Sequence, residues 1–323
     1  MTRYHTPRQS ASLALACTLL AAATTLPAAA QAAVPGTPST PAAAGPAGAG
    51  EPCPTLTRFR PQRFGDATDL DNVHQPLRPG TDITLQAVAN SGNELLPHVV
   101  VLTATDLIKK IDGVWTRVLW QRDWREGEAF ASALIFQAQD DDGNIWQLGE
   151  YPEPVEDELP PGAPGAWIAG VAGARAGVVV PGDPDRDEPP YLRAEAPGIG
   201  LLGCAFVVDT ADEVCAPAIC YDDALVIEEF SPLLAPPVRR AYVPGIGLVA
   251  AAQANSDGET LYLSGRRNLT TAERLTSAWE AVQLEERAYA ASDVYVDTPP
   301  MRLHAEDAAA EAVRQLLGQR LRH

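Results

Sequence analysis

The sequence is poor in lysine, methionine and histidine, and it lacks the short motifs that mark common catalytic classes. Lys109 and Lys110 are the only lysines among 323 residues, alongside two methionines and five histidines. A Gly-x-Ser-x-Gly elbow, a His-Glu-x-x-His helix and a Walker loop are all missing. The histidines are too widely spaced to suggest a ligand set. We therefore expect no metal and no cofactor, and we identify no catalytic residue.

Basic residues are scarce overall, and no apolar run is long enough to cross a membrane as a helix. The chain has 24 Lys and Arg against 42 Asp and Glu. A surface this acidic repels phosphate groups, so we expect no nucleic-acid partner. A transmembrane helix needs about 20 consecutive apolar residues, and the N-terminal stretch Leu13–Ala23 is shorter than that. We expect no transmembrane span.

Residues 1–33 have the layout of a secretory signal peptide. Arg3 and Arg8 precede the apolar stretch, and Ala28–Ala32 offers small-residue cleavage sites. Cleavage would leave 22 basic and 42 acidic residues, a net charge of −20, in a secreted or periplasmic protein. Leu15-Ala16-Cys17 resembles a lipoprotein cleavage box, so lipidation at Cys17 is an alternative. Residues 34–56, rich in Pro, Ala and Gly, are expected to form a disordered tether.

Four cysteines, Cys53, Cys204, Cys215 and Cys220, remain after cleavage. An even number in an exported chain favours disulfides, and four cysteines allow three pairings. One pairing closes a tight loop between Cys215 and Cys220 and joins Cys53 to Cys204. Pairing Cys204 with Cys215 or Cys220 across a hairpin is the alternative.

Alternating apolar residues and tight turns predict an antiparallel β domain over residues 57–265. Its centre is residues 112–150, expected to form three strands joined at Glu126-Gly127 and at Asp142-Gly143, the latter as a type I′ turn. Pro197-Gly198 and Pro244-Gly245 predict turns with glycine at positive φ. The proline-rich segments 152–164 and 181–190 are expected to be surface loops. Between these loops, the glycines at Gly170 and Gly173 suggest turns or a close approach of backbones. Further strands are expected at Thr81–Val88, Val99–Thr105 with Leu107–Ile111, Leu202–Val208, Ala224–Phe230, Val238–Val243, Gly247–Ala252 and Thr260–Leu263.

The pattern changes to helix in residues 266–323, which we expect to form a helical C-terminal extension. Thr270 and Glu273 fit a capping box ahead of a helix at Ala272–Ala290. A second helix is expected at Leu303–Leu321, packed on the sheet or, alternatively, bound to an envelope protein. The expected fold is mainly β, α+β overall, with a curved antiparallel sheet or open barrel and C-terminal helices.

Aromatic and acidic residues supply the candidate binding groups. Trp120 and Trp124 share one face of a strand, and Trp115 lies on the other, where it is free to stack on a ligand. The acidic stretch Asp140–Asp142 suggests calcium ligands, but a hairpin turn explains it better. The loop acids Asp66, Asp69 and Asp71 are the other ion candidates. For an apolar ligand the candidate residues are Trp115, Trp120, Phe130, Leu134, Phe136, Trp146 and Trp167, each with core packing as its alternative.

From about Phe64 to Leu263 the chain resembles an uncharacterised family of exported bacterial β-rich proteins. The resemblance is carried by Ile111–Val114, Gln139–Glu150, Trp167–Ala174 and Tyr242–Val249. This family has no assigned activity, so the resemblance implies export and a β fold but no catalytic role. The segment Tyr242–Val249 is also similar, more weakly, to a turn in half-barrels that bind lipids or lipoproteins.

These observations favour an exported, non-catalytic binding protein for an apolar small molecule or lipid. One alternative is a hydrolase whose site is assembled only in the fold. A second is a cell-envelope interaction module that presents its C-terminal helices to a partner protein.

Overall fold

The computed structural model describes residues 53–88, 97–154, 165–231, 234–254 and 259–304. The predicted signal peptide, most of the predicted tether and most of the second predicted helix lie outside these residues. Within the described part, no helix is long and apolar enough to cross a membrane.

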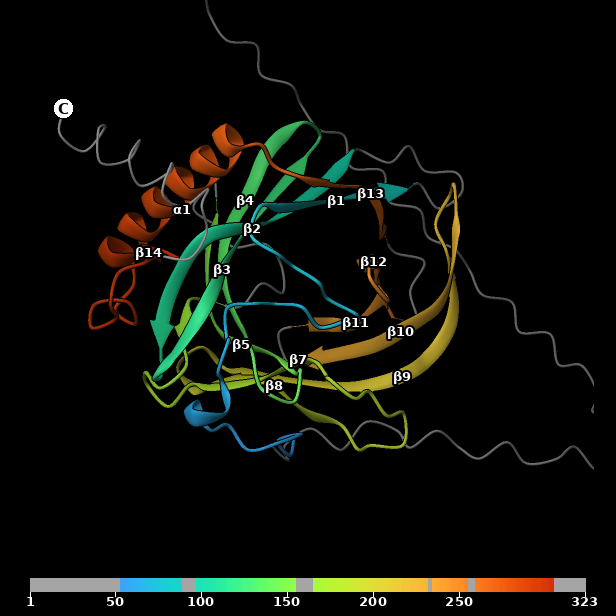
Figure 1. Ribbon diagram of the computed structural model, residues 1–323, viewed down its shortest axis with the longest axis horizontal. Helices are drawn as coiled ribbons and strands as arrows, with labels where there is room; N and C mark the ends of the chain where they lie inside the picture. Colours follow the sequence, from blue (N-terminus) through green and yellow to red (C-terminus); the bar gives the residue numbers. More distant parts are fainter. Residues whose placement is uncertain (1–52, 89–96, 155–164, 232–233, 255–258, 305–323) are drawn as a thin grey trace, which may run out of the picture. The chain divides into compact units, whose positions relative to one another are not determined.

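The fold is a closed, mainly antiparallel β-barrel of 12 strands with one helix on its outer face (Figure 1). The expected mainly β class is confirmed, but the expected curved sheet or open barrel is wrong, because the barrel is closed. Strand β1 pairs with β13 on one side and with β2 on the other, and this second pairing closes the ring. Closure leaves no free edge among the main strands, which removes the hazard of edge-to-edge aggregation.

The main strands follow the chain in hairpins, so neighbours in sequence are mostly neighbours in the barrel. Their order is β1-β13-β12-β11-β10-β9-β8-β7-β5-β4-β3-β2, with the short strands β6 and β14 pairing at β5 and β2. The bounds are β1 Thr81–Val88, β2 His98–Ile111, β3 Val114–Arg125, β4 Glu128–Gln139, β5 Ile145–Pro154, β6 Trp167–Ile168, β7 Arg175–Val180, β8 Tyr191–Ala196, β9 Leu201–Cys215, β10 Cys220–Ser231, β11 Leu234–Val243, β12 Gly247–Gln253, β13 Thr260–Asn268 and β14 Arg302–Leu303.

Local chemistry explains the three hairpins that join β2, β3, β4 and β5. Asp112-Gly113 and Glu126-Gly127 both have positive φ at each position, as type I′ turns require. At the third hairpin only Gly143 has positive φ, so the expected type I′ turn at Asp142-Gly143 is wrong. Asp140 replaces it with a side-chain network, because its carboxylate accepts hydrogen bonds from the backbone of Asp142 and Asn144 and from Trp146 Nε1.

The two Pro-Gly turns differ from one another. Gly245 has φ +74°, and Ile246 N donates to Val243 O, as expected for a turn with Pro244 and Gly245 at its centre. At the other site, Pro197–Ile199 forms a 3-10 turn, and the positive φ falls on Gly200 instead of Gly198.

Several strand assignments depart from the sequence analysis. Strand β5 continues through Pro152 and Pro154, which pair with β4, while the other side of β5 is paired only nearer its start. A proline is tolerated there because its missing N–H faces no neighbouring strand. Strands β6, β7 and β8 were not predicted, and β14 occupies Leu303, where a helix was expected.

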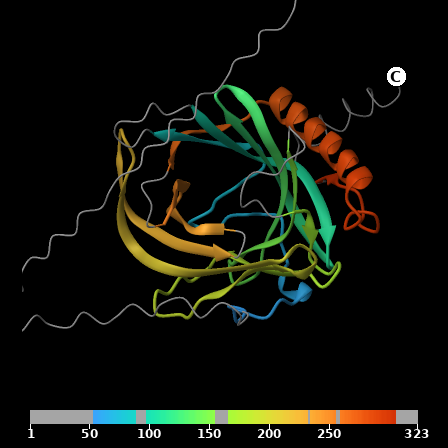
Figure 2. The same ribbon diagram turned by 180° about the vertical axis from the view of Figure 1, so that it is seen from behind.

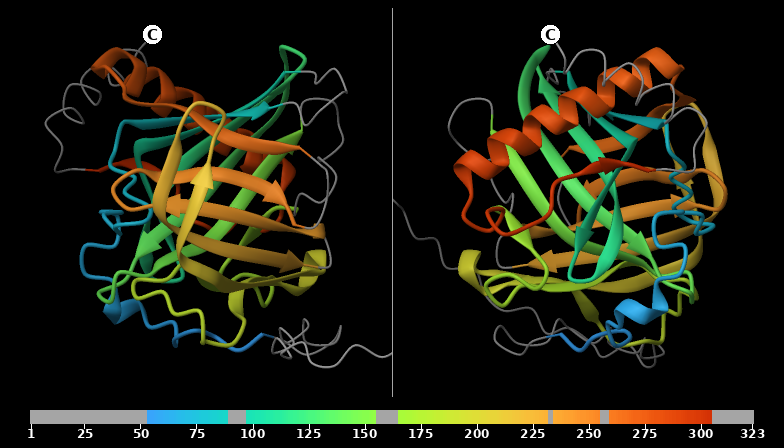
Figure 3. Two further views of the ribbon diagram at one scale, coloured as in Figure 1. Left: turned by 90° about the vertical axis from the view of Figure 1, so that its right-hand side faces the viewer. Right: turned by 60° about the vertical axis from the view of Figure 1, so that its left-hand side comes forward.

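Helix α1 (Thr271–Ala291) lies across the outer face of strands β2 to β4 (Figure 3). The predicted capping box is confirmed, since Thr270 Oγ1 accepts from Glu273 N and Thr270 N donates to Glu273 Oε2. Small and apolar residues, among them Ala278, Ala281 and Leu284, form the buried face of the helix. The part of the C-terminal extension that the structure describes therefore packs on the barrel.

Two ion pairs attach α1 to β2. Lys109, with no exposed side-chain surface, lies 2.6 Å from Glu285 and also donates to Pro299 O. Near the other end of the helix Arg274 Nε donates to Asp106 Oδ2 at 2.8 Å.

The N-terminal segment is tied to the barrel from Cys53 onward. Cys53 is bonded to Cys204 on β9, and Leu192 N on β8 donates to Pro54 O. Residues 53–56, assigned to the tether from sequence, therefore belong to the folded unit. The segment then crosses the ring of strands before β1 begins (Figures 1 and 2), and Arg117 inside the barrel donates to Thr68 O.

Candidate functional site

The barrel encloses a cavity of about 340 Å³. Side chains from β1 to β5 and from β7 to β12 reach it, together with Gln75 and Leu77 of the crossing segment and Trp167 of β6. A cavity of this size lies in the range that proteins use for small molecules.

One side of the cavity is an apolar wall formed by Ile83, Leu102, Leu119 and Ile135, from the consecutive strands β1 to β4. These residues form two cross-strand pairs, Ile83 with Leu102 and Leu119 with Ile135. Because the pairs lie on adjacent strands, the wall is a continuous surface that can accept the apolar part of a ligand.

The other side is a charged cluster formed by Glu150, Arg193, Glu229 and Arg240, from β5, β8, β10 and β11. Glu229 is 1% exposed, and one of its oxygens lies 3.0 Å from Arg193 Nε and 3.1 Å from Arg240 Nε. Burial opposes ionisation of Glu229, but the two guanidinium groups outweigh it and lower the pKa of Glu229. Glu229 is therefore ionised and shared by two cations.

The pKa of Glu150 is shifted in the opposite direction from that of Glu229. Burial raises the pKa of Glu150, and Arg193, Gln147 and Arg240 offset this only in part. Its one hydrogen bond among the described residues comes from Gln147 Nε2, at 3.0 Å. The pKa values of the two carboxyl groups of the cluster are thus shifted in opposite directions.

A β-bulge brings Gln147 and Glu150 to the same side of β5. Residues three apart on a regular strand face opposite ways, but the pairing with β4 shifts so that Phe136 faces Gly149 and Gln137 faces Gln147. At Gly149 a Cβ would lie 2.8 Å from Trp167 O, which explains the glycine beside the bulge. Ile135, the last residue of the apolar wall, pairs directly with Glu150.

A histidine bridges two carboxylates near another part of the lining. His98 Nε2 lies 2.9 Å from Asp123, which lines the cavity, and Nδ1 contacts Glu259. Burial disfavours the charged imidazole, but the two carboxylates outweigh it and raise the pKa of His98. The contacts of His98 with Asp123 and Glu259 thus connect β2 to β3 and to the residue just before β13.

Of the seven residues predicted to bind an apolar ligand, the structure places Trp167 on the cavity. Trp120, Leu134 and Phe136 have the opposite parity from the lining residues of β3 and β4 and lie on the outer face. Phe136 contacts Tyr295 there, and Trp120 faces Ser277 of α1 across a surface pocket.

The remaining three predicted residues lie away from the cavity. Trp146 is buried against Phe59 and Phe64. Trp115 is half-buried, with Arg302 stacked on its ring, and Phe130 packs under Arg125. Ligand binding by these residues stays a prediction.

The sequence analysis missed all four members of the charged cluster. Glu229 and Arg240 each belong to a pair of adjacent like charges, Glu228-Glu229 and Arg239-Arg240, inside otherwise apolar strand segments. Because neighbouring residues on a strand face opposite sides of the sheet, one member of each pair must point into the barrel, and that pattern is the signal that pointed to them. Glu150 carries no such signal, because its direction depends on the bulge. Arg193 lies on β8, which was not predicted as a strand.

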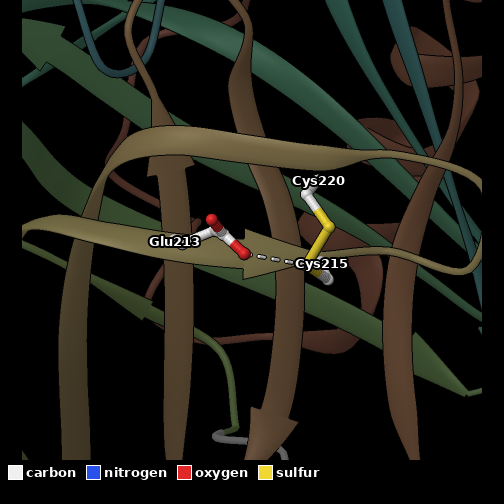
Figure 4. A group of neighbouring side chains, drawn as sticks. All are labelled: Glu213, Cys215 and Cys220. Atoms are coloured by element: carbon white, nitrogen blue, oxygen red, sulfur yellow. Dashed lines mark hydrogen bonds between the residues drawn. A yellow bond between two sulfur atoms is a disulfide. The ribbon is translucent and has the colours of Figure 1, made fainter.

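Metal-ligating side chains converge at one place among the described residues, Glu213 with Cys215 and Cys220 (Figure 4). The two cysteines are bonded to one another at the end of the β9–β10 hairpin. Their sulfurs are therefore unavailable as thiolate ligands. The observed pairs, Cys215 with Cys220 and Cys53 with Cys204, are those of the first pairing considered above, and disulfides of this kind agree with a secreted or periplasmic protein.

Comparisons with known proteins give no family. No family model matches the chain, and no curated protein is similar to it in sequence. One similar structure is an exported protein with a YmcC-like fold from Bacteroides fragilis, at 14% identity and a TM-score of 0.34, covering 61% of this chain and 100% of that one. Another, described as a lipoprotein from Parabacteroides distasonis, has 12% identity and a TM-score of 0.31, with 63% and 100% coverage. Neither description names a ligand, and so the resemblance to lipid-binding half-barrels gains no support from them.

Proposed function

We propose that this exported protein binds a small amphipathic molecule inside the barrel. The observation that carries the proposal is a cavity of about 340 Å³ lined by an apolar wall on β1 to β4 and by a charged cluster on β5, β8, β10 and β11. Ligand pockets are typically lined mainly by apolar groups, with a few polar groups that orient the ligand. No reaction is needed to explain this arrangement.

Native mass spectrometry of the mature protein, purified from its exported form, tests the proposal. We expect a bound mass that disappears after organic extraction and returns when the extract is added back. Finding only the bare chain, with no uptake from the extract, would contradict the proposal.

A cavity-filling variant links the bound mass to the barrel interior. Ala133 is buried on β4 and lines the cavity, so Ala133→Phe should place a ring in the space a ligand needs. Ala211→Phe is the matched control, because Ala211 is exposed on the β9–β10 hairpin. We expect loss of the bound mass in the first variant and retention in the second.

A second candidate function is glycoside hydrolysis, favoured by one observation: Glu150 and Glu229 share a cavity with pKa values shifted in opposite directions. Such a pair can supply a proton donor and an ionised carboxylate. This function ranks below binding because both arginines occupy Glu229, which weakens it as a base or nucleophile. Hydrolysis of aryl glycosides that is lost in Glu150→Gln and in Glu229→Gln would reverse the ranking.

A further inference from the structure

The charged cluster has more positive than negative charge facing the cavity. Arg193 and Arg240 share one oxygen of Glu229 through their Nε atoms. No described residue accepts a hydrogen bond from their terminal amino groups. Both side chains keep accessible surface, 19% and 31%, although Glu229 between them is almost fully buried. Since both arginines line the cavity, that surface is available to a ligand.

The nearby carboxyl group of Glu150 makes no ion pair with either arginine among the described residues. Glu150 hydrogen-bonds Gln147 instead of an arginine, and burial raises the pKa of Glu150 toward the neutral form. Its other neighbours in the barrel, Ile135 on β4 and Trp167 on β6, carry no charge. Tyr191 and Tyr242 also stay neutral, because burial raises the pKa of each. Two guanidinium groups therefore pair with one carboxylate, that of Glu229, and a buried charge is costly unless a counter-charge accompanies it.

We infer that the ligand carries a single carboxylate, which lies against the terminal amino groups of Arg193 and Arg240 while its apolar part contacts the apolar wall. A planar carboxylate matches the N–H geometry of a guanidinium better than a neutral hydroxyl does. The direct pairing of Ile135 with Glu150 places the apolar and charged regions side by side, so one short amphiphile can contact both. This inference rests on the proposed function and adds the chemical class of the ligand.

Octanoate and 1-octanol form a matched pair of probes for titration calorimetry on the extracted, full-length mature protein at neutral pH. Hydrogen bonds to charged groups contribute about 1.5–3 kcal/mol, so we expect octanoate to bind about 10-fold to 100-fold more tightly than octanol. Equal affinities would overturn the inference and leave the proposed function standing. Failure of both probes to bind would overturn the inference and count against the proposed function as well.

Two neighbouring arginines provide the variant and its control. Arg240→Gln removes one cation of the cluster but leaves Glu229 paired with Arg193. Arg239→Gln removes a cation from the outer face of the same strand, where Arg239 pairs with Glu228. We expect the preference for octanoate to vanish in Arg240→Gln and to persist in Arg239→Gln. A preference that survives in a folded Arg240→Gln protein would overturn the inference, and the comparison of probes on the unmodified protein does not depend on how this variant folds.

Discussion

At the scale of single residues, the buried lysine on β2 is the clearest case of a charge that depends on one partner. Lys109 is fully buried, and Glu285 of α1 is 5% exposed at the side chain. Removing one member of a buried pair leaves the other uncompensated, which costs about 3–5 kcal/mol. We expect Lys109→Met to lower the free energy of unfolding by this amount in urea denaturation.

The control is the double variant Lys109→Met with Glu285→Gln. Glutamine keeps an oxygen that can accept from Met301 N, as Glu285 does, but it brings no buried charge. The double variant should recover part of the lost stability. If it is as unstable as Lys109→Met alone, loss of packing and not the unpaired charge explains the effect.

The contribution of His98 to the free energy of unfolding depends on pH. Asp123 and Glu259 raise the pKa of His98 above its ordinary value of 6.5. A group with a raised pKa in the folded state contributes its full stability below the unfolded pKa and loses it as the pH rises through the folded pKa. We therefore expect the free energy of unfolding of the natural protein, relative to that of His98→Gln, to fall as the pH rises from below 6.5 through the raised pKa.

Glu150 also has a raised pKa and produces a slope of the same sign. Both proteins contain Glu150, so its contribution cancels when the two curves are subtracted. A difference that does not change with pH would show that His98 is not charged in the folded protein.

At the scale of elements, the capping box decides how helix α1 begins. Thr270 accepts from Glu273 N and thereby satisfies one of the backbone donors that the first turn leaves without partners. Thr270→Ala should cost about 1 kcal/mol, measured as a lower free energy of unfolding. Thr276→Ala, an exposed threonine-to-alanine change later in the same helix, should cost little, because alanine is the better helix former. Equal effects at both sites would contradict a special role for the cap.

Local chemistry predicted the elements better than it predicted the site. The capping box, the turn at Glu126-Gly127 and strand β1 follow from residues adjacent in sequence, and each was predicted from them. Strand β8 was missed because Pro181–Pro190 and the turn at Pro197 frame only a short segment. The inward direction of Glu150 depends on a bulge against β4, and a bulge is decided by pairing with a distant strand.

At the scale of the whole molecule, closure of the barrel determines which face becomes a site. Alternation along β3 and β4 correctly separates two faces, but sequence alone does not say which one is inside. Trp120, Leu134 and Phe136 form the more apolar face, and it lies outside because α1 covers it. The inner face keeps Leu119 and Ile135 together with polar residues such as Gln121. The helix therefore packs on the more apolar face of these strands, and the face that carries both polar and apolar residues lines the cavity.

The two disulfides constrain the whole chain to very different extents. Cys53 and Cys204 are 151 residues apart, whereas Cys215 and Cys220 are 5 apart. In the chain-entropy treatment a cross-link stabilises a protein by restricting its unfolded state, by about 5 kcal/mol for the long loop and about 2 kcal/mol for the short one. Replacing both cysteines of each pair by serine should thus lower the free energy of unfolding by about 3 kcal/mol more for the long loop. The short loop lies at the exposed end of the β9–β10 hairpin, so its loss should also leave octanoate binding unchanged. Equal losses of stability in the two double-serine proteins would mean that native contacts around the sulfurs, and not loop closure, determine what these bonds contribute.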